Sequence, residues 1–304
     1  MLPNSVEIAG DNRHLCKERG FLAVYAKNER LGRLPLDDLG VLLVAGHGIT
    51  YSNDLVVALA ERCVPMFLCN RRMLPVGLFW SLQGHHLSSR RVQAQASLKP
   101  ALRKRMWQQI VKTKIKLQAQ VVELRGGEPR HLLNYSKRVG SGDPQNMEGA
   151  AARCYWGQAF GPDFRRRRDK SGINSLLNYA YTIVRAATAR AVMLAGLHPA
   201  FSIFHRNARN PMPLVDDLME PYRPLADLTV LGLVQNGVAE LDKNAKESLC
   251  GIPSLDIEQG SEVRIVAESL KSCASSLAEV CLGNKRTLAL PDSLRLETKE
   301  KSGS

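Results

Sequence analysis

The sequence lacks the features that mark disulfide-rich secreted domains, zinc ribbons and membrane-spanning chains. Its seven cysteines are odd in number and widely scattered, and none forms a CxxC pair, so neither a disulfide framework nor a zinc ribbon is indicated. The longest apolar runs, such as residues 41–45, are far too short to cross a bilayer. The first residues show no basic and apolar stretch of the signal-peptide kind. We therefore expect a protein of a reducing compartment with no membrane partner.

A low aromatic content and the absence of three sequence motifs disfavour several classes of function. Aromatic residues make up only 6% of the chain, which disfavours a stacking platform for single-stranded bases. The motifs GxxxxGK(S/T), HExxH and GxSxG do not occur, so phosphate-loop nucleotide hydrolysis, zinc proteolysis and nucleophile-elbow chemistry lack their signatures. With 304 residues, 44% of them apolar, the chain can still bury a sizeable core, and its length favours about two domains.

What the sequence has in excess is positive charge, and that charge is concentrated. The formal net charge is +13. Residues 85–140 hold 13 Lys and Arg against two acids, and residues 153–209 hold ten against two, so the rest of the chain is net acidic. A chain kept soluble by charge usually intersperses both signs, although Lys- and Arg-rich helix surfaces also serve solubility alone. We interpret the segregation as a face that binds a nucleic-acid backbone.

Periodicity divides the chain into a β-rich N-terminal part and a larger helical part, which is an α+β class. A helix beginning at Ser52 or Asn53 interrupts the strands. Strands are predicted at residues 20–26, 41–45, 64–68 and 74–80. The expected organisation is a β-rich domain at residues 1–82, a linker at 83–92, a helical domain at 93–288 and a disordered tail at 289–304.

The helical part begins with a long helix after Pro100, and Lys112, Lys114 and Lys116 lie on the flanks of its apolar stripe. A second helix is expected from Asp143, as N-cap, and Pro144. Further helices are predicted at residues 173–195 and near 214–236 and 260–282.

Acids and one histidine stand out among the apolar residues of this part. Glu148 is surrounded by small alanines, and it is either a first-turn glutamate favoured by the helix dipole or a functional carboxylate. His205 ends an apolar segment, where a hydrogen-bonded core histidine is more common than a ligand. Glu220 shares a helix face with Asp217 or with Asp216, and neighbouring carboxylates repel each other unless a cation lies between them. Such donors suit Mg²⁺ or Mn²⁺, although their spacing alone arises easily by chance.

A polar stripe and an arginine run are further candidates. One face of an otherwise apolar helix carries four polar residues, which either bond neighbouring helices or support a polar site: Asn174, Asn178, Tyr181 and Arg185. A dense cationic loop precedes that helix: Arg165, Arg166, Arg167 and Arg168. The loop is a solvated charge run, a nuclear address or a phosphate contact, which the guanidinium fork suits well.

Four motifs, in this order along the chain, resemble the CRISPR-associated integrase family, the first Cas protein. They are EGAAARCYW at residues 148–156, NxLLNYAY at 174–181, AGLHP at 195–199 leading to His205, and LVDDLMEPYRP at 214–224. The segment WQQIVKTKIKLQA at residues 107–119 resembles the version found with type II systems. The resemblance covers roughly residues 5–285.

The resemblance implies a β-sandwich-like N-terminal domain, a flexible linker and an all-helical catalytic domain. It also implies one divalent-metal site, for Mg²⁺ or Mn²⁺, with Glu148, His205 and Glu220 as ligands and Asp217 as an accompanying catalytic acid. Asp216 matches that role less well, and many relatives have Asp in place of Glu220. Residues expected to contact DNA are Arg165, Arg166, Arg167, Arg168, Asn178, Tyr181, Arg185, Lys112 and Lys116.

The implied activity is DNA integration in CRISPR adaptation, in the bacterial cytoplasm. The 3′-hydroxyl of a short captured DNA duplex attacks a phosphodiester at the border of a repeat array, and this transesterification needs no ATP. His205 can ligate only when neutral, so activity should fall below about pH 6.5. The implied partners are double-stranded DNA, a second copy of the chain in a homodimer, and a dimer of the small second CRISPR-associated protein that bridges two such dimers. Participation of the RNA-guided effector nuclease stays open.

Two rival functions are compatible with the same residues. One is a general metal-dependent nuclease that acts on branched DNA. The other is a non-catalytic scaffold that binds nucleic acid, in which the acids merely form helix caps and salt bridges.

Overall fold

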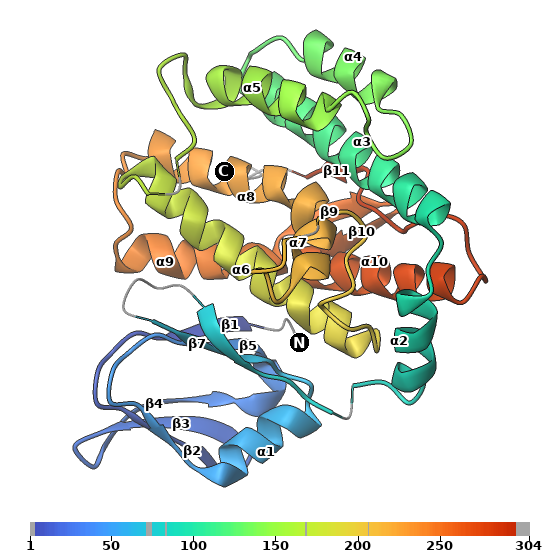
Figure 1. Ribbon diagram of the computed structural model, residues 1–304. Coiled ribbons are helices and arrows are strands. Elements are labelled where there is room, and N and C mark those ends of the chain that lie inside the picture. The colour runs from blue at the N-terminus through green and yellow to red at the C-terminus, as the bar shows by residue number, and fades with distance from the viewer. Residues whose placement is uncertain (1–3, 71–74, 83, 168, 206, 296–304) are drawn as a thin grey trace, which may run out of the picture.

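The computed structural model describes residues 4–70, 75–82, 84–167, 169–205 and 207–295. It has β-sheets in its N-terminal part and helices in its C-terminal part (Figure 1), so the expected α+β class is confirmed. The Arg168 side chain, one of the expected DNA contacts, lies outside the described residues. In the described ranges, no helix is both long and apolar enough to span a bilayer.

The N-terminal part contains two sheets, the helix α1 (Asn53–Glu61) and the 3-10 turn η1 (Leu36–Asp38). One sheet has the order β1–β5–β7–β8, and the other has the order β4–β3–β2–β6. Helix α1 begins after Ser52, whose hydroxyl accepts a hydrogen bond from the Leu55 amide, which confirms the predicted helix start. The strands are β1 (Asn4–Ile8), β2 (His14–Glu18), β3 (Phe21–Ala26), β4 (Glu29–Pro35), β5 (Leu39–Val44), β6 (Thr50–Tyr51), β7 (Met66–Cys69) and β8 (Pro75–Phe79).

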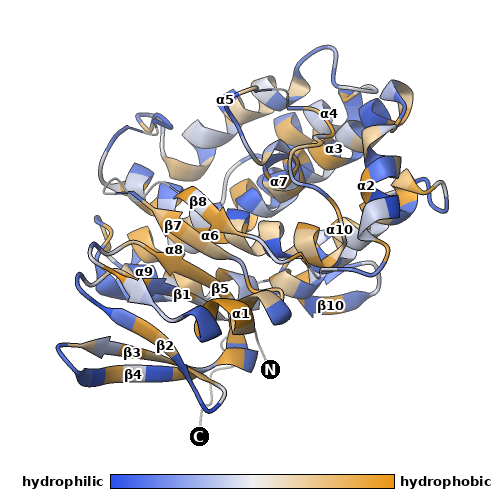
Figure 2. Cartoon of the chain, turned by 60° about the horizontal axis from the view of Figure 1, so that its bottom comes forward, coloured by the Kyte–Doolittle hydropathy of each residue, from blue (hydrophilic) through white to orange (hydrophobic). Residues whose placement is uncertain are grey.

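Strand β5 joins the N-terminal part to the helical part. Leu15 of one sheet, Leu42 of the other and Leu55 of α1 are fully buried in a shared aliphatic core. Because successive side chains of a strand point to opposite faces, Val41 and Leu43 leave this core and pack with the helices instead. Apolar residues therefore run continuously along β5 (Figure 2), as is usual for a strand covered on both faces.

In the helical part, the 22-residue helix α6 (Ile173–Leu194) packs against α7, α8 and α10 and against strand β5. The long helix α3 (Pro100–Leu124) has Pro100 in its first turn, as predicted, and packs against α4, α5 and α8. The other helices are α2 (Ser88–Ala96), α4 (Arg130–Arg138), α5 (Met147–Phe160), α7 (Pro213–Met219), the 3-10 turn η2 (Glu220–Tyr222), α8 (Arg223–Gln235), α9 (Lys243–Cys250), the 3-10 turn η3 (Ile252–Ser254) and α10 (Val266–Cys281).

The helical part also contains a small sheet of order β10–β9–β11, although its sequence shows no strand pattern that we recognised. Strands β9 (Asp256–Gln259) and β10 (Glu262–Ile265) form a hairpin where the start of a helix was expected. Strand β11 (Ser293–Leu294) lies in the expected tail and pairs with β9. Within the expected linker, residues from Ser88 onward already belong to helix α2.

The helix expected from Pro144 begins later, at Met147. Asn146 adopts a left-handed conformation with φ of 52°, and its side chain accepts a hydrogen bond from the Gly149 amide. Asp143 acts one turn further out, because its carboxylate accepts hydrogen bonds from the amides of Met147 and Glu148. These two caps fix the direction in which α5 presents Glu148.

Candidate functional site

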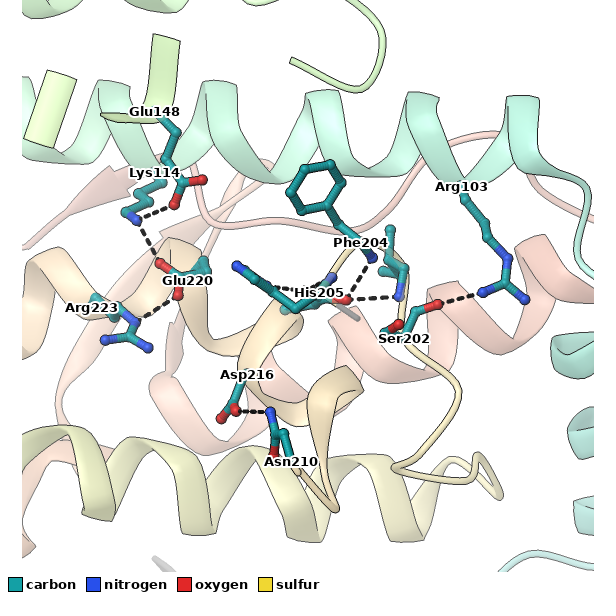
Figure 3. A network of polar contacts seen from close by, with 12 residues as sticks. Arg103, Lys114, Glu148, Ser202, Phe204, His205, Asn210, Asp216, Glu220 and Arg223 are labelled. Carbon is teal, nitrogen blue, oxygen red and sulfur yellow. Dashed lines mark hydrogen bonds and ion pairs between the residues drawn. The ribbon is translucent and has the colours of Figure 1, made fainter. Parts of the chain in front are cut away.

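Two glutamates from separate elements meet around one lysine (Figure 3). Glu148 lies in the first turn of α5, Glu220 begins η2, and Lys114 lies near the middle of α3. The Nζ atom of Lys114 is 2.6 Å from Glu148 Oε1 and 2.6 Å from Glu220 Oε2. Arg223, at the start of α8, places its Nε 2.9 Å from Glu220 Oε1. Two acids are therefore balanced by two bases.

Because these ion pairs are buried, they strongly affect the pKa values of Lys114 and Glu220. The side chains of Lys114 and Glu220 are only 11% and 7% exposed. Burial alone would lower the pKa of Lys114, but the carboxylates of Glu220 and Glu148 outweigh it and raise that pKa. Burial would likewise raise the pKa of Glu220, but the charges of Arg223 and Lys114 hold it well below its usual value. Both groups are consequently ionised at neutral pH.

His205 lies in the loop between α6 and α7 and is held by Asp217 of α7, which is fully buried. Asp217 Oδ1 lies 2.6 Å from Nδ1 of His205, and Asp217 Oδ2 accepts hydrogen bonds from the amides of Ile203 and Phe204 at 2.7 and 2.8 Å. When the imidazole is neutral, a proton on Nδ1 leaves Nε2 available as a ligand atom. Figure 3 shows the His205 ring directed toward Glu220.

The contact with Asp217 also sets the charge of the imidazole. The hydrogen bond with Asp217 raises the pKa of His205 despite burial of the ring, and nearby Glu220 and Glu148 act in the same direction. Burial raises the pKa of Asp217 in turn, although the hydrogen bonds that it accepts oppose this shift. The raised pKa of His205 moves the expected acid limit of activity to a higher pH.

Aromatic packing fixes the loop that carries His205. The ring of Trp107, fully buried in α3, stacks on that of Phe204 with centroids 4.3 Å apart and an interplanar angle of 2°. The same indole meets the His205 ring nearly at a right angle, with centroids 5.1 Å apart. Helix α3 thus supports the site twice, with Trp107 against the histidine loop and with Lys114 between the glutamates.

Asp216 is directed away from this cluster. Its carboxylate pairs with Arg185 of α6, with Arg185 Nε 2.6 Å from Oδ1, and accepts a hydrogen bond from the Asn210 side chain at 2.6 Å. The sequence left Asp216 and Asp217 as alternatives, and the structure separates them. Asp217 organises His205, whereas Asp216 ties α7 to α6.

A buried network lies behind Arg223. The Arg223 guanidinium lies over the Tyr181 ring, 4.6 Å from its centroid. The hydroxyls of Tyr181 and Tyr155 donate hydrogen bonds to the two oxygens of Asp227, at 2.5 and 2.9 Å. Burial raises the pKa of Asp227 to about 6, although the tyrosine hydrogen bonds oppose it. The network therefore holds Arg223 against Glu220.

The donor set fits a divalent cation, but the side chains are not gathered as ligands. Among the residues described, no three or more His, Cys, Asp or Glu side chains are grouped so that they could hold a metal ion. Lys114 lies between the two glutamates as a stand-in cation. Glu220 Oε2 is buried, and its contact with Lys114 at 2.6 Å is an ion pair. Two carboxylates and one imidazole suit Mg²⁺ or Mn²⁺.

The expected DNA contacts fall into two groups. Arg165, Arg167 and Lys116 are exposed, and Lys112 is half-buried. The remaining side chains make internal contacts: Arg166 donates hydrogen bonds to Asn174 and Asn178, Arg185 pairs with Asp216, and Tyr181 is 9% exposed with its hydroxyl on Asp227. The polar stripe of α6 therefore bonds neighbouring segments, one of the two alternatives left open by the sequence.

Sequence reasoning missed two residues of the cluster, Lys114 and Arg223. The sequence places Lys114 on a flank of the apolar stripe of the long helix, and in the structure its side chain is only 11% exposed. It lies on a buried stripe with Trp107, Val111 and Gln118, which are spaced by three or four residues. That spacing was a usable signal for Lys114. Arg223 stands inside the motif at residues 214–224, but only the fold brings it to Glu220.

A family model and a similar protein show the family to which this chain belongs. The family model described as CRISPR associated protein Cas1 matches residues 6–251. The chain is 35% identical over 269 residues to the CRISPR-associated endonuclease Cas1 of Neisseria meningitidis serogroup C (strain 8013). The matched region covers 87% of this chain and 88% of the relative. The chain belongs to the Cas1 family. The resemblance found in the sequence is thereby confirmed, and the Neisseria relative is consistent with its type II character.

Solved structures of other proteins share the fold. A casposase bound to an integration product superposes with a TM-score of 0.75 at 18% identity, covering 95% of this chain and 92% of that one. A Cas6-RT-Cas1–Cas2 complex gives a TM-score of 0.71 at 19% identity, covering 93% of this chain and 35% of that one. The whole Cas1-family fold, from the first sheet to the last helices, is thus present here.

Proposed function

We propose that this chain is a divalent-metal-dependent DNA integrase and endonuclease of CRISPR adaptation. It would join the 3′-hydroxyl ends of short DNA duplexes into a repeat array by transesterification, in the bacterial cytoplasm. The observation that carries the proposal is the meeting of Glu148 of α5 and Glu220 of η2 at Lys114, with His205 of the α6–α7 loop directed toward Glu220 (Figure 3). These three residues lie in or directly follow the motifs that resemble the family.

In this proposal, Glu148, Glu220 and Nε2 of His205 hold a Mg²⁺ or Mn²⁺ ion. When bound, the ion supplies Lewis-acid activation of the attacking hydroxyl and neutralises charge on the phosphate. Asp217 keeps the proton on Nδ1 and thereby directs Nε2 outward. Arg223 keeps Glu220 ionised, and Trp107 with Phe204 restricts the histidine loop. Asp217, Trp107 and Phe204 are positioning residues in this scheme.

Exposed cations would hold the duplex. Arg165, Arg167, Lys112 and Lys116 are our candidates for phosphate contacts, because their side chains are at least partly exposed on the strongly basic part of the chain. If about six phosphates are neutralised, the logarithm of DNA affinity should fall against log salt with a slope of about −5. We further propose a homodimer as the working unit, bridged to a second by a dimer of the small second CRISPR-associated protein.

The test is strand transfer with His205→Ala. A duplex with 3′-hydroxyl ends is incubated with a supercoiled plasmid that carries a repeat array, the partner protein and Mn²⁺, and joined products are scored. We expect His205→Ala to lose joining while it retains DNA affinity, because the exposed cations are unchanged. His131→Ala, an exposed histidine on α4, is the matched control and should join DNA normally.

The rivals predict different products. A scaffold without chemistry would leave joining unchanged in His205→Ala. A nuclease for branched DNA would cut in the wild type without forming joined products. Either outcome would refute the integrase proposal.

A further inference from the structure

Lys114 occupies a position that the proposed metal site does not explain. Its ammonium group lies between Glu148 and Glu220, 2.6 Å from an oxygen of each, and its side chain is 11% exposed. The two glutamates come from α5 and η2, which are far apart along the chain, and Lys114 comes from a third element, α3. A basic residue thus bridges the two carboxylates that would otherwise bind the ion.

The two carboxylates need a cation to stay together. Two carboxylates within ion-pair distance of the same ammonium group repel each other in a buried site, and leaving them unpaired would be costly. Arg223 contacts only Glu220, so it does not join the two elements. Among the residues that the structure describes, Lys114 lies within ion-pair distance of both glutamates. Without it, Glu148 and Glu220 would be expected to separate.

The ammonium and a divalent ion cannot share these oxygens. An ion held by Glu148 Oε1 and Glu220 Oε2 would need the space that Nζ fills, and its double positive charge would repel the ammonium. We propose that Lys114 is the internal counter-cation of the metal-free site, which holds Glu148 and Glu220 together and leaves their oxygens when a divalent ion binds. This inference rests on the proposed metal site.

The inference predicts competition, and Lys114→Met tests it. Methionine is unbranched and only one heavy atom shorter than lysine, and it carries no charge. We expect the variant to bind Mn²⁺ at least about tenfold more tightly than the wild type in titration calorimetry without DNA, because no ammonium must be displaced. In EDTA its melting temperature should be lower than that of the wild type, and Mn²⁺ should raise it by more degrees.

Lys104→Met is the matched control. Lys104 lies on the same helix and is exposed, so the substitution changes the net charge equally without touching the glutamates. Its Mn²⁺ affinity should equal that of the wild type. An affinity of Lys114→Met that is unchanged or weaker would overturn the inference while leaving the metal site intact. Absence of Mn²⁺ binding in the wild type as well as the variant would refute the metal site itself.

A measurement on the wild type tests the same inference without any substitution, so misfolding of the variant does not affect it. Acetylation of Lys114 by a water-soluble reagent, followed by mass spectrometry, should be slow in EDTA because the amine is paired and nearly buried. In Mn²⁺ it should be several-fold faster, whereas acetylation of Lys104 should not change. Equal rates at Lys114 in EDTA and in Mn²⁺ would overturn the inference without any substitution.

Discussion

The two cores of this molecule handle charge in opposite ways. The core between the N-terminal sheets and α1 is aliphatic, and an ion pair of that part, Arg30 with Glu18, has side chains that are 51% and 39% exposed. In the helical part, Asp217, Glu220 and Asp227 are each no more than 5% exposed. The side chain of Glu7 in β1 is also buried, but it lies at the boundary between the N-terminal and helical parts. Its partners Tyr179 and Lys246 belong to α6 and α9.

The difference separates what the fold requires from what the chemistry requires. An aliphatic core stabilises a domain through burial alone. Buried carboxylates cost free energy unless they are paired, so a fold gains little by collecting them. Their concentration in the helical part therefore favours a functional site over a purely structural role. Substitutions in the two cores should accordingly change different properties.

Removing one charge of the site should have the largest effect. We expect Glu220→Gln to reduce strand transfer to the level of metal-free protein, because the amide has the same shape but is a far poorer ligand for Mg²⁺ or Mn²⁺. Glu258→Gln, on the exposed side of β9, should leave strand transfer unchanged. Substantial joining by Glu220→Gln would mean that this acid is not a ligand.

Truncating the N-terminal core should affect stability instead. Leu42→Ala removes a fully buried side chain between the sheets, and it should lower the free energy of unfolding by about 2–5 kcal/mol. Mn²⁺ affinity of the remaining folded protein should not change, because Leu42 points away from the helical part. Urea unfolding and titration calorimetry measure the two quantities. Loss of Mn²⁺ binding in folded Leu42→Ala would show that the two cores are coupled.

Neutralising Asp227 should change how stability depends on pH. Its folded pKa of about 6 lies above that of an unfolded aspartate, so its stabilising contribution is complete below about pH 4 and is lost as the pH rises through 6. Asp227→Asn lacks this loss and should gain up to about 3 kcal/mol relative to the wild type between pH 4 and pH 8. Urea unfolding of both proteins across this range gives the difference. If the free energies of unfolding of the two proteins changed in parallel with pH, the raised pKa of Asp227 would be contradicted.

The smallest effect is expected at the residue that orients His205. Asp217→Asn should weaken Mn²⁺ affinity and strand transfer by about 10–100-fold, as is usual when a group that orients a histidine ligand is replaced. The loss should be smaller than that of His205→Ala, because the imidazole remains. Asp216→Asn is the matched comparison: it loosens α7 from Arg185 but leaves His205 in place, so its Mn²⁺ affinity should stay normal. Equal losses in both variants would argue against the specific role of Asp217.

Local sequence signals predicted those elements that local physics determines. Ser52 and Pro100 mark the starts of α1 and α3 because capping and proline geometry act within one turn. Strand β4 (Glu29–Pro35) escaped prediction because most of its side chains are exposed, so it shows no apolar alternation. The hairpin β9–β10 escaped for a similar reason, since β10 presents no fully buried side chain.

The site was predictable only in part. Helical spacing limited the partners of Glu220 to Asp216 and Asp217, but the choice depended on which face of α7 meets the histidine loop. Lys114 carries a charge at a buried position of α3, and its partners come from α5 and η2. Such a meeting is decided by tertiary packing, which no short window of sequence contains.

The most direct test of the metal site is a crystal of the protein soaked with Mn²⁺ and measured for anomalous scattering. We expect one anomalous peak in direct contact with Glu148, Glu220 and Nε2 of His205, with the Lys114 ammonium withdrawn from both carboxylates. A peak elsewhere, or a saturated Mn²⁺ soak that leaves Lys114 between Glu148 and Glu220, would contradict it.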